Sequence, residues 1–157
     1  MEKTVIILDG VSIGKTKFCD TAKANEYWIW NINHRNVLSM LAHKIGWDGN
    51  RNRKFHDFIS EFVEMANRFW NFEEYYCGNM LEKFERNERA TLLVVHSCSK
   101  PLRLKMQEKV NNCFGIMIAE EGEKESTYDI TLNCNAENFE EEILETLDVL
   151  SKNERSE

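Results

Sequence analysis

A short segment near the start of the chain carries the residues best suited to chemistry. It runs from Leu8 to Phe18 and reads LDGVSIGKTKF, with Gly-Lys-Thr at residues 14–16. Gly-Lys-Thr ends a nucleotide-phosphate loop, whose first glycine stands five residues before the second. Here that position holds Asp9, and Gly10 lies one residue too close. The segment is therefore either a shortened phosphate loop or an ordinary strand–turn–helix connection.

Each residue of this phosphate segment, residues 10–16, has a defined role if it binds a nucleotide. Lys15 would reach the outer phosphates of ATP, and the Thr16 hydroxyl would bind Mg²⁺. A carboxylate at Asp9 would repel phosphate unless it points away or meets the metal. The backbone amides that would surround the phosphate oxygens belong to Gly10, Val11, Ser12, Ile13 and Gly14.

The surrounding sequence alternates strand and helix patterns. Short apolar, β-branched or aromatic runs predict strands, and apolar residues spaced three and four apart predict helices. We expect strands at residues 4–9, 27–32, 90–97, 114–119 and 128–133. We expect helices at residues 15–24, 34–45, 53–70, 73–85, 100–112 and 139–150. The phosphate segment follows the first strand and begins a helix, which is the context that a phosphate loop requires.

This alternation predicts an α/β fold of three layers, with a mostly parallel sheet covered by helices on both faces. We expect one domain over residues 1–151, with a helical insertion from Arg53 to Arg86 and a disordered tail at 152–157. In such sheets, ligands bind beyond the carboxyl ends of the strands. The loops at that edge follow Leu8, Ile32, His96, Ala119 and Asn133.

The composition excludes several classes of protein. The chain has 157 residues, of which 20 are Lys or Arg and 27 are Asp or Glu, so its net charge is −7. An acidic chain is a poor candidate for general nucleic-acid binding. The five cysteines lie far apart and form no Cys-x-x-Cys pair, so we expect reduced thiols in a cytoplasmic protein. No apolar stretch approaches the length of a membrane span.

Four stretches together resemble the phage-type deoxynucleoside monophosphate kinases of the P-loop NTPase superfamily. The first is ILDGVSIGKT at residues 7–16, whose first glycine departs from the complete loop. The second is AHKIGWDG at residues 42–49, where the family has an LGWDG-like motif. The third is Arg53–Phe55, like the start of a family helix that reads GRKFL. The fourth is YDITLNCNAENFEEEI at residues 128–143, which is similar to the closing segment of the family.

The resemblance implies transfer of the γ-phosphoryl group of ATP to a nucleoside or deoxynucleoside monophosphate, with Mg²⁺ bound. Lys15 and Thr16 match the family motif. Arg53 would hold the acceptor phosphate, unless it is a solvated arginine at the start of a helix. Asn133 would contact the adenine, unless it caps a helix. We therefore expect a small nucleotide as the ligand, and no general binding of nucleic acids. A homodimer is possible, and the sequence does not decide this point.

The chain departs from the family at three positions where catalysis needs charge. Ser99 stands where the family tends to carry an arginine after the third strand, although Lys100 and Arg103 are nearby. The lid, residues 119–126, is acidic where the family tends to have arginines, and His96 ends the third strand in place of an aspartate. The leading hypothesis is a nucleoside monophosphate kinase. The alternative is a degenerate relative that binds a nucleotide or a protein partner without catalysis.

The aromatic residues offer a site for a nucleobase. Trp28 and Trp30 are expected in the core of the second strand, and Trp70 in the core on the apolar side of its helix. Trp47, in a loop, is the candidate to stack on a base or to hinge a lid. His34 follows the second strand, where it would contact the acceptor or lie in solvent.

Overall fold

The computed structural model describes residues 3–120 and 127–152, and the lid residues 121–126 lie outside this description together with residues 153–157 of the expected tail. The strands are β1 (Thr4–Gly10), β2 (Ile29–Ile32), β3 (Leu92–His96), β4 (Cys113–Ala119) and β5 (Ile130–Asn133). The helices are α1 (Ser12–Ala24), α2 (His34–Lys44), α3 (Arg53–Trp70), α4 (Phe72–Arg86), α5 (Lys100–Lys109) and α6 (Phe139–Lys152).

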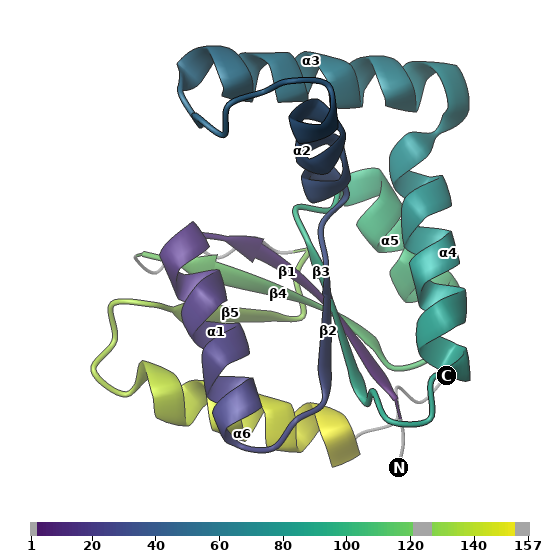
Figure 1. The fold of residues 1–157 in the computed structure, drawn as a ribbon. Helices are drawn as coiled ribbons and strands as arrows, with labels where there is room; N and C mark the ends of the chain where they lie inside the picture. Colours follow the sequence, from purple (N-terminus) through teal and green to yellow (C-terminus); the bar gives the residue numbers. More distant parts are fainter. Residues whose placement is uncertain (1–2, 121–126, 153–157) are drawn as a thin grey trace.

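The strands form one sheet in the order β2-β3-β1-β4-β5, and each neighbouring pair is parallel. Helices α1 and α6 cover one face, and α4 and α5 cover the other (Figure 1). The expected α/β fold of three layers is confirmed. No helix in the described part of the chain combines the length and the apolar character that a membrane crossing requires.

The central strand β1 is buried on both faces, because its side chains alternate between two cores. Ile6 and Leu8 pack with Phe18 of α1 in the first core. Val5 and Ile7 pack under α4 and α5 in the second core. The uninterrupted apolar run of this strand is therefore what a strand covered on both sides needs.

Helices α2 and α3 form a unit that stands away from the sheet. Figure 1 shows α3 lying across α2, beyond the layer of α4 and α5. Leu38 and Ala42 of α2 pack against Phe55 and Ile59 of α3 in a third, smaller core. Of the expected insertion, only α3 lies outside the layers, because α4 returns to cover the sheet.

Two aromatic predictions are wrong. Trp28 precedes β2, which begins at Ile29, and is 60% exposed; Trp30 does pack against a core. Trp70 is 57% exposed at the end of α3. Helical periodicity shows which side of a helix is apolar, but it does not show how much of that side a neighbour covers.

The apolar side of α3 is wider than the surface that α2 offers. Phe58, Phe62, Met65 and Phe69 are spaced three and four apart, which places them on one stripe. This stripe is turned about 70° around the helix from the buried stripe of Phe55, Ile59 and Ala66. The side chains of this second stripe are all exposed.

Two glycines test how strongly the first turn is constrained. Gly10 and Gly46 share a φ of +111°, but a Cβ at Gly10 would lie 2.0 Å from the Ile118 carbonyl oxygen, whereas a Cβ at Gly46 would meet no atom within 4 Å. We expect Gly46→Ala to lower the free energy of unfolding by about 1 kcal/mol, through backbone strain alone. Gly10→Ala should lower it by about 3 kcal/mol or more, because a backbone atom cannot move aside.

Urea unfolding of the two variants and the unsubstituted chain measures this difference. Gly46→Ala is the matched control, since it carries the same backbone strain without the collision. Equal losses in the two variants would contradict the proposed contact with Ile118.

Candidate functional site

The phosphate segment forms a tighter turn than a phosphate loop. Helix α1 begins at Ser12, with only Val11 between it and β1. The Val11 amide donates to the Ile118 carbonyl at 3.0 Å, and the Lys15 amide donates to the Val11 carbonyl at 3.0 Å. The amides at the first positions of α1, those of Ser12, Ile13 and Gly14, have no partner within the helix. They are the donors that remain for an anion.

Packing explains why residue 14 is a glycine. A Cβ there would lie 2.4 Å from the Cγ2 of Ile118 and 2.9 Å from the Cβ of Cys134. Gly14 thus lets the first turn of α1 lie directly against β4 and the end of β5. Both glycines of the phosphate segment are therefore required by contacts within the protein, whether or not an anion binds.

Lys15 is half-buried and lies near the ends of β2 and β3. There the Nε2 atom of His96 lies 2.9 Å from the Oδ1 atom of Asn31, and the Cys19 thiol donates to the same oxygen at 3.2 Å. Because that oxygen only accepts, His96 carries its proton on Nε2. Burial, and then the charge of Lys15, lower the pKa of His96 to about 4. His96 is therefore neutral at pH 7.

The side chains that could meet Mg²⁺, those of Thr16 and Asp9, form hydrogen bonds with other residues of the protein. The Thr16 hydroxyl donates to the Ser12 carbonyl at 3.2 Å. The Asp9 carboxylate accepts a hydrogen bond from the Tyr128 hydroxyl at 2.5 Å. The described residues contain no group of three or more His, Cys, Asp or Glu side chains arranged to hold a metal ion. Metal binding through Thr16 stays a prediction.

Arg103 lies four residues from Ser99, where the resemblance expects an arginine, but it is only 1% exposed, whereas Lys100, next to Ser99, is exposed. Its guanidinium donates to the carbonyl and the hydroxyl of Thr127 at 2.8 and 3.0 Å, and it lies over the Tyr128 ring at 3.7 Å. Its Nε has no partner among the described residues. Arg103 supports the segment before β5 and presents no free guanidinium to a phosphate.

Glu73 is a buried carboxylate at the start of α4. It accepts from the Ser99 amide at 2.7 Å and from the thiol of Cys98. Burial lowers the pKa of the neighbouring His34 imidazole, and the charge of Glu73 opposes that shift. His34 is buried, so its expected position in solvent is wrong, and its edge meets the ring of Phe72.

The remaining predicted residues, Arg53 and Asn133, lie on separate elements, at the start of α3 and the end of β5. Arg53 is exposed at the start of α3, where Asn52 caps the helix by accepting from the Phe55 amide at 2.9 Å. Asn133 accepts from the Asn135 amide at 2.9 Å, so its side chain closes the turn after β5. The adenine contact of Asn133 and the acceptor contact of Arg53 stay predictions.

Trp47 is less available to a nucleobase than its position in a loop indicates. Its ring stacks on Phe55, with centroids 3.8 Å apart and planes at 4°, and lies 4.6 Å from the ring of His43. Its indole nitrogen donates to the Asn50 carbonyl at 3.1 Å. Trp47 therefore anchors the loop between α2 and α3.

Sequence reasoning missed the roles of Glu73, Arg103 and Tyr128, and no local signal marks them. Glu73 resembles any acidic residue in the first turn of a helix. The bonds that fix these side chains join residues far apart in sequence, such as Tyr128 and Asp9. Only the register of the folded chain brings them together.

A pH titration tests the environment of His96. Its pKa in the folded chain lies below its ordinary value of 6.5, so on acidification the unfolded chain binds this proton first. Its contribution to stability is complete above pH 6.5 and is lost as the pH falls toward 4. Between pH 7 and 4.5, we expect the unsubstituted chain to lose about 2 kcal/mol more free energy of unfolding than His96→Gln.

Urea unfolding at the two pH values measures this loss. Glutamine can still donate to Asn31, so the comparison isolates the titration. Equal losses, or an NMR titration of the His96 ring centred near pH 6.5, would contradict the burial of this imidazole.

Comparisons with known proteins agree with the fold. No protein-family model and no curated protein sequence matches the chain. An APS kinase, CysC of Mycobacterium tuberculosis, is similar in structure, with 12% identity, 96% of this chain and 99% of that chain covered, and a TM-score of 0.52. A de novo designed protein with the P-loop NTPase fold is 9% identical over 97% of this chain and 95% of its own, with a TM-score of 0.46. The likeness to the APS kinase shows a shared α/β fold, and the chemistry of this chain rests on its own residues.

Proposed function

We propose that this chain is a kinase-fold protein that binds a phosphate-bearing ligand, such as a nucleotide, at the start of α1 without transferring the phosphoryl group at the rate of a kinase. One observation carries the proposal. The Lys15 amide is bonded to Val11, which leaves the three amides of Ser12, Ile13 and Gly14. Three amides at a helix start suit one phosphate group better than the chain of phosphates in ATP.

The position of Lys15 supports binding. Its side chain is half-buried at the edge of the sheet where ligands bind in parallel α/β folds. The neighbouring His96 is neutral at pH 7, so the positive charge at this position is that of Lys15. A lysine close to free amides at a helix start is a favourable partner for a phosphate oxygen.

The other catalytic groups of a kinase are weakly represented. Phosphoryl transfer needs several cations or metal ions around the transferring group. Here Arg103 is buried against Tyr128, and Asp9 is bonded to the same residue. Ser99 binds Glu73 through its amide, and that carboxylate brings negative charge to the edge of the sheet. This arrangement favours binding over transfer.

An active nucleoside or deoxynucleoside monophosphate kinase of the phage type is the second candidate. Arg53 favours it, because this arginine is exposed at the start of α3 and forms no ion pair among the described residues. ATP with Mg²⁺ at Thr16 would be the phosphoryl donor, Arg53 would hold the acceptor phosphate, and Asn133 would contact the adenine. This candidate requires residues 10–16 to open around the phosphates.

A thermal-shift comparison of two lysines tests phosphate binding. Lys17 lies on the same helix but is exposed and paired with Glu140 at 3.5 Å. We expect ADP or a nucleoside monophosphate to raise the melting temperature of the unsubstituted chain and of Lys17→Ala. Lys15→Ala should lose that increase while it keeps the same unliganded melting temperature. The proposal fails if no nucleotide stabilises the chain, or if both variants respond equally.

A coupled assay of ADP release separates the two candidates. With ATP, Mg²⁺ and each common monophosphate, the proposal expects no release above the rate of ATP alone. Turnover that disappears in both Lys15→Ala and Arg53→Ala would establish the kinase in its place.

A further inference from the structure

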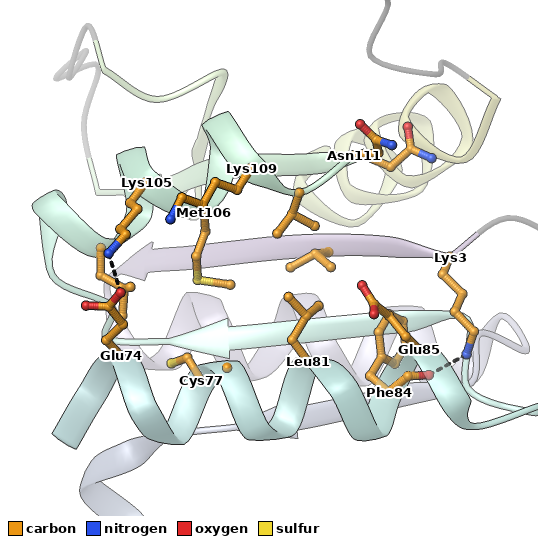
Figure 2. A pocket seen from close by; sticks show the side chains of 15 residues that line it. Lys3, Glu74, Cys77, Leu81, Phe84, Glu85, Lys105, Met106, Lys109 and Asn111 are labelled. Carbon is orange, nitrogen blue, oxygen red and sulfur yellow. Dashed lines mark hydrogen bonds and ion pairs between the residues drawn. The ribbon is translucent and has the colours of Figure 1, made fainter. Parts of the chain in front are cut away.

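A groove of about 530 Å³ lies between α4 and α5, on the face of the sheet opposite α1 (Figure 2). Its floor is apolar and includes Val5, Cys77, Leu81 and Met106. The volume falls in the range of small-molecule sites, which combine an apolar lining with a few polar groups. The phosphate segment contributes no residue to this groove, so the two sites are independent.

Gly78 keeps one wall of the groove open. It lies in the interior of α4, where glycine costs about 1 kcal/mol relative to alanine. A Cβ on Gly78 would meet no atom within 4 Å, whereas a Cβ on Gly10 or Gly14 would collide with the protein. Packing within the described chain therefore does not require this glycine. Its effect is to leave space in the groove.

The charged groups are unevenly distributed along the groove. At one end, Lys105 forms an ion pair with Glu74 that bridges α5 and α4. Lys109 follows one helical turn later, and its amino group extends toward the same end (Figure 2). Among the described residues Lys109 forms no ion pair.

At the opposite end of the groove, the cation among the described lining residues is Lys3. The Lys3 ammonium there is held by the carbonyls of Phe84, Asn87 and Ala90. Glu85 lies beside it and would repel an anion. The groove thus has an apolar floor, and two lysines against one carboxylate, Glu74, give a positive balance of charge at the end where Lys109 lies.

We propose that this groove binds a small amphipathic carboxylate, with its carboxylate at Lys109 and its hydrocarbon portion over Gly78, Leu81 and Met106. An ammonium pairs with a carboxylate by a charge-assisted hydrogen bond. The apolar floor removes the hydrocarbon from water. A neutral apolar molecule would leave the Lys109 ammonium without a charged partner. A fully polar anion would leave the apolar floor in contact with water.

Decanoate and decanol test the class of ligand. We expect decanoate to bind saturably at one site in isothermal titration calorimetry, and decanol to bind about tenfold more weakly because it lacks the charge. In spectra of the chain labelled at its methionine methyl groups, decanoate should shift the signal of Met106 in the groove. The signal of Met65, exposed on α3, should not move.

Variants at Gly78 and Asn79 test the location. Gly78→Leu fills the groove and favours the helix, so it should fold at least as stably as the unsubstituted chain while raising the Kd of decanoate at least about tenfold. Asn79→Leu, the matched control, adds the same side chain at an exposed neighbour that does not line the groove, and should leave the Kd unchanged. Lys109→Gln should raise the Kd of decanoate about tenfold and leave that of decanol unchanged.

Three results would overturn the proposal. One is the absence of saturable decanoate binding to the unsubstituted chain. Another is decanoate binding that survives Gly78→Leu. The third is equal affinity for decanoate and decanol, which would assign the groove to apolar contacts alone.

Discussion

The contact between the first turn and Ile118 determines where Lys15 and Thr16 of the phosphate segment can lie. Gly10 approaches the Ile118 carbonyl so closely that no side chain fits there, and the Val11 amide donates to the same carbonyl. The chain can then enter α1 directly, and Gly14 packs the first helical turn against β4. Lys15 and Thr16 consequently lie inside a helix, and the number of free amides follows from this single contact.

Two buried charged side chains form hydrogen bonds within the protein, whereas a kinase would direct such charges at its substrate. Glu73 ties α4 to the amide of Ser99, and Arg103 ties α5 to Thr127. Because a buried charge is costly without a partner, neither side chain can turn toward a ligand without leaving its partner unpaired. The end of β3 is therefore rigidly supported. Because of these same hydrogen bonds, the Arg103 guanidinium and the Ser99 amide are not available to bind a phosphate.

The sequence predicted the layers of the fold because each strand and helix carries its own signal. The strand expected at residues 4–9 and the helix expected at 139–150 are β1 and α6 of the structure. The start of α1 was placed at Lys15 in place of Ser12, since glycine and lysine after a strand indicate a loop. The burial of Trp70 was wrong because periodicity does not reveal what covers a helix. The bonds of Glu73 and Arg103 depend on distant partners, so no local pattern could predict them.

A site that retains phosphate binding does not thereby retain phosphoryl transfer. Amides that hold a bound phosphate stabilise the ground state and the transition state alike, so they add affinity without rate. Rate requires groups whose interaction strengthens as charge moves toward the leaving oxygen, such as mobile cations or Mg²⁺. In this chain Lys15 is the one such cation in the phosphate segment, and Thr16 and Asp9 are bonded elsewhere. A helix start with one lysine therefore favours recognition of a phosphate group over its transfer.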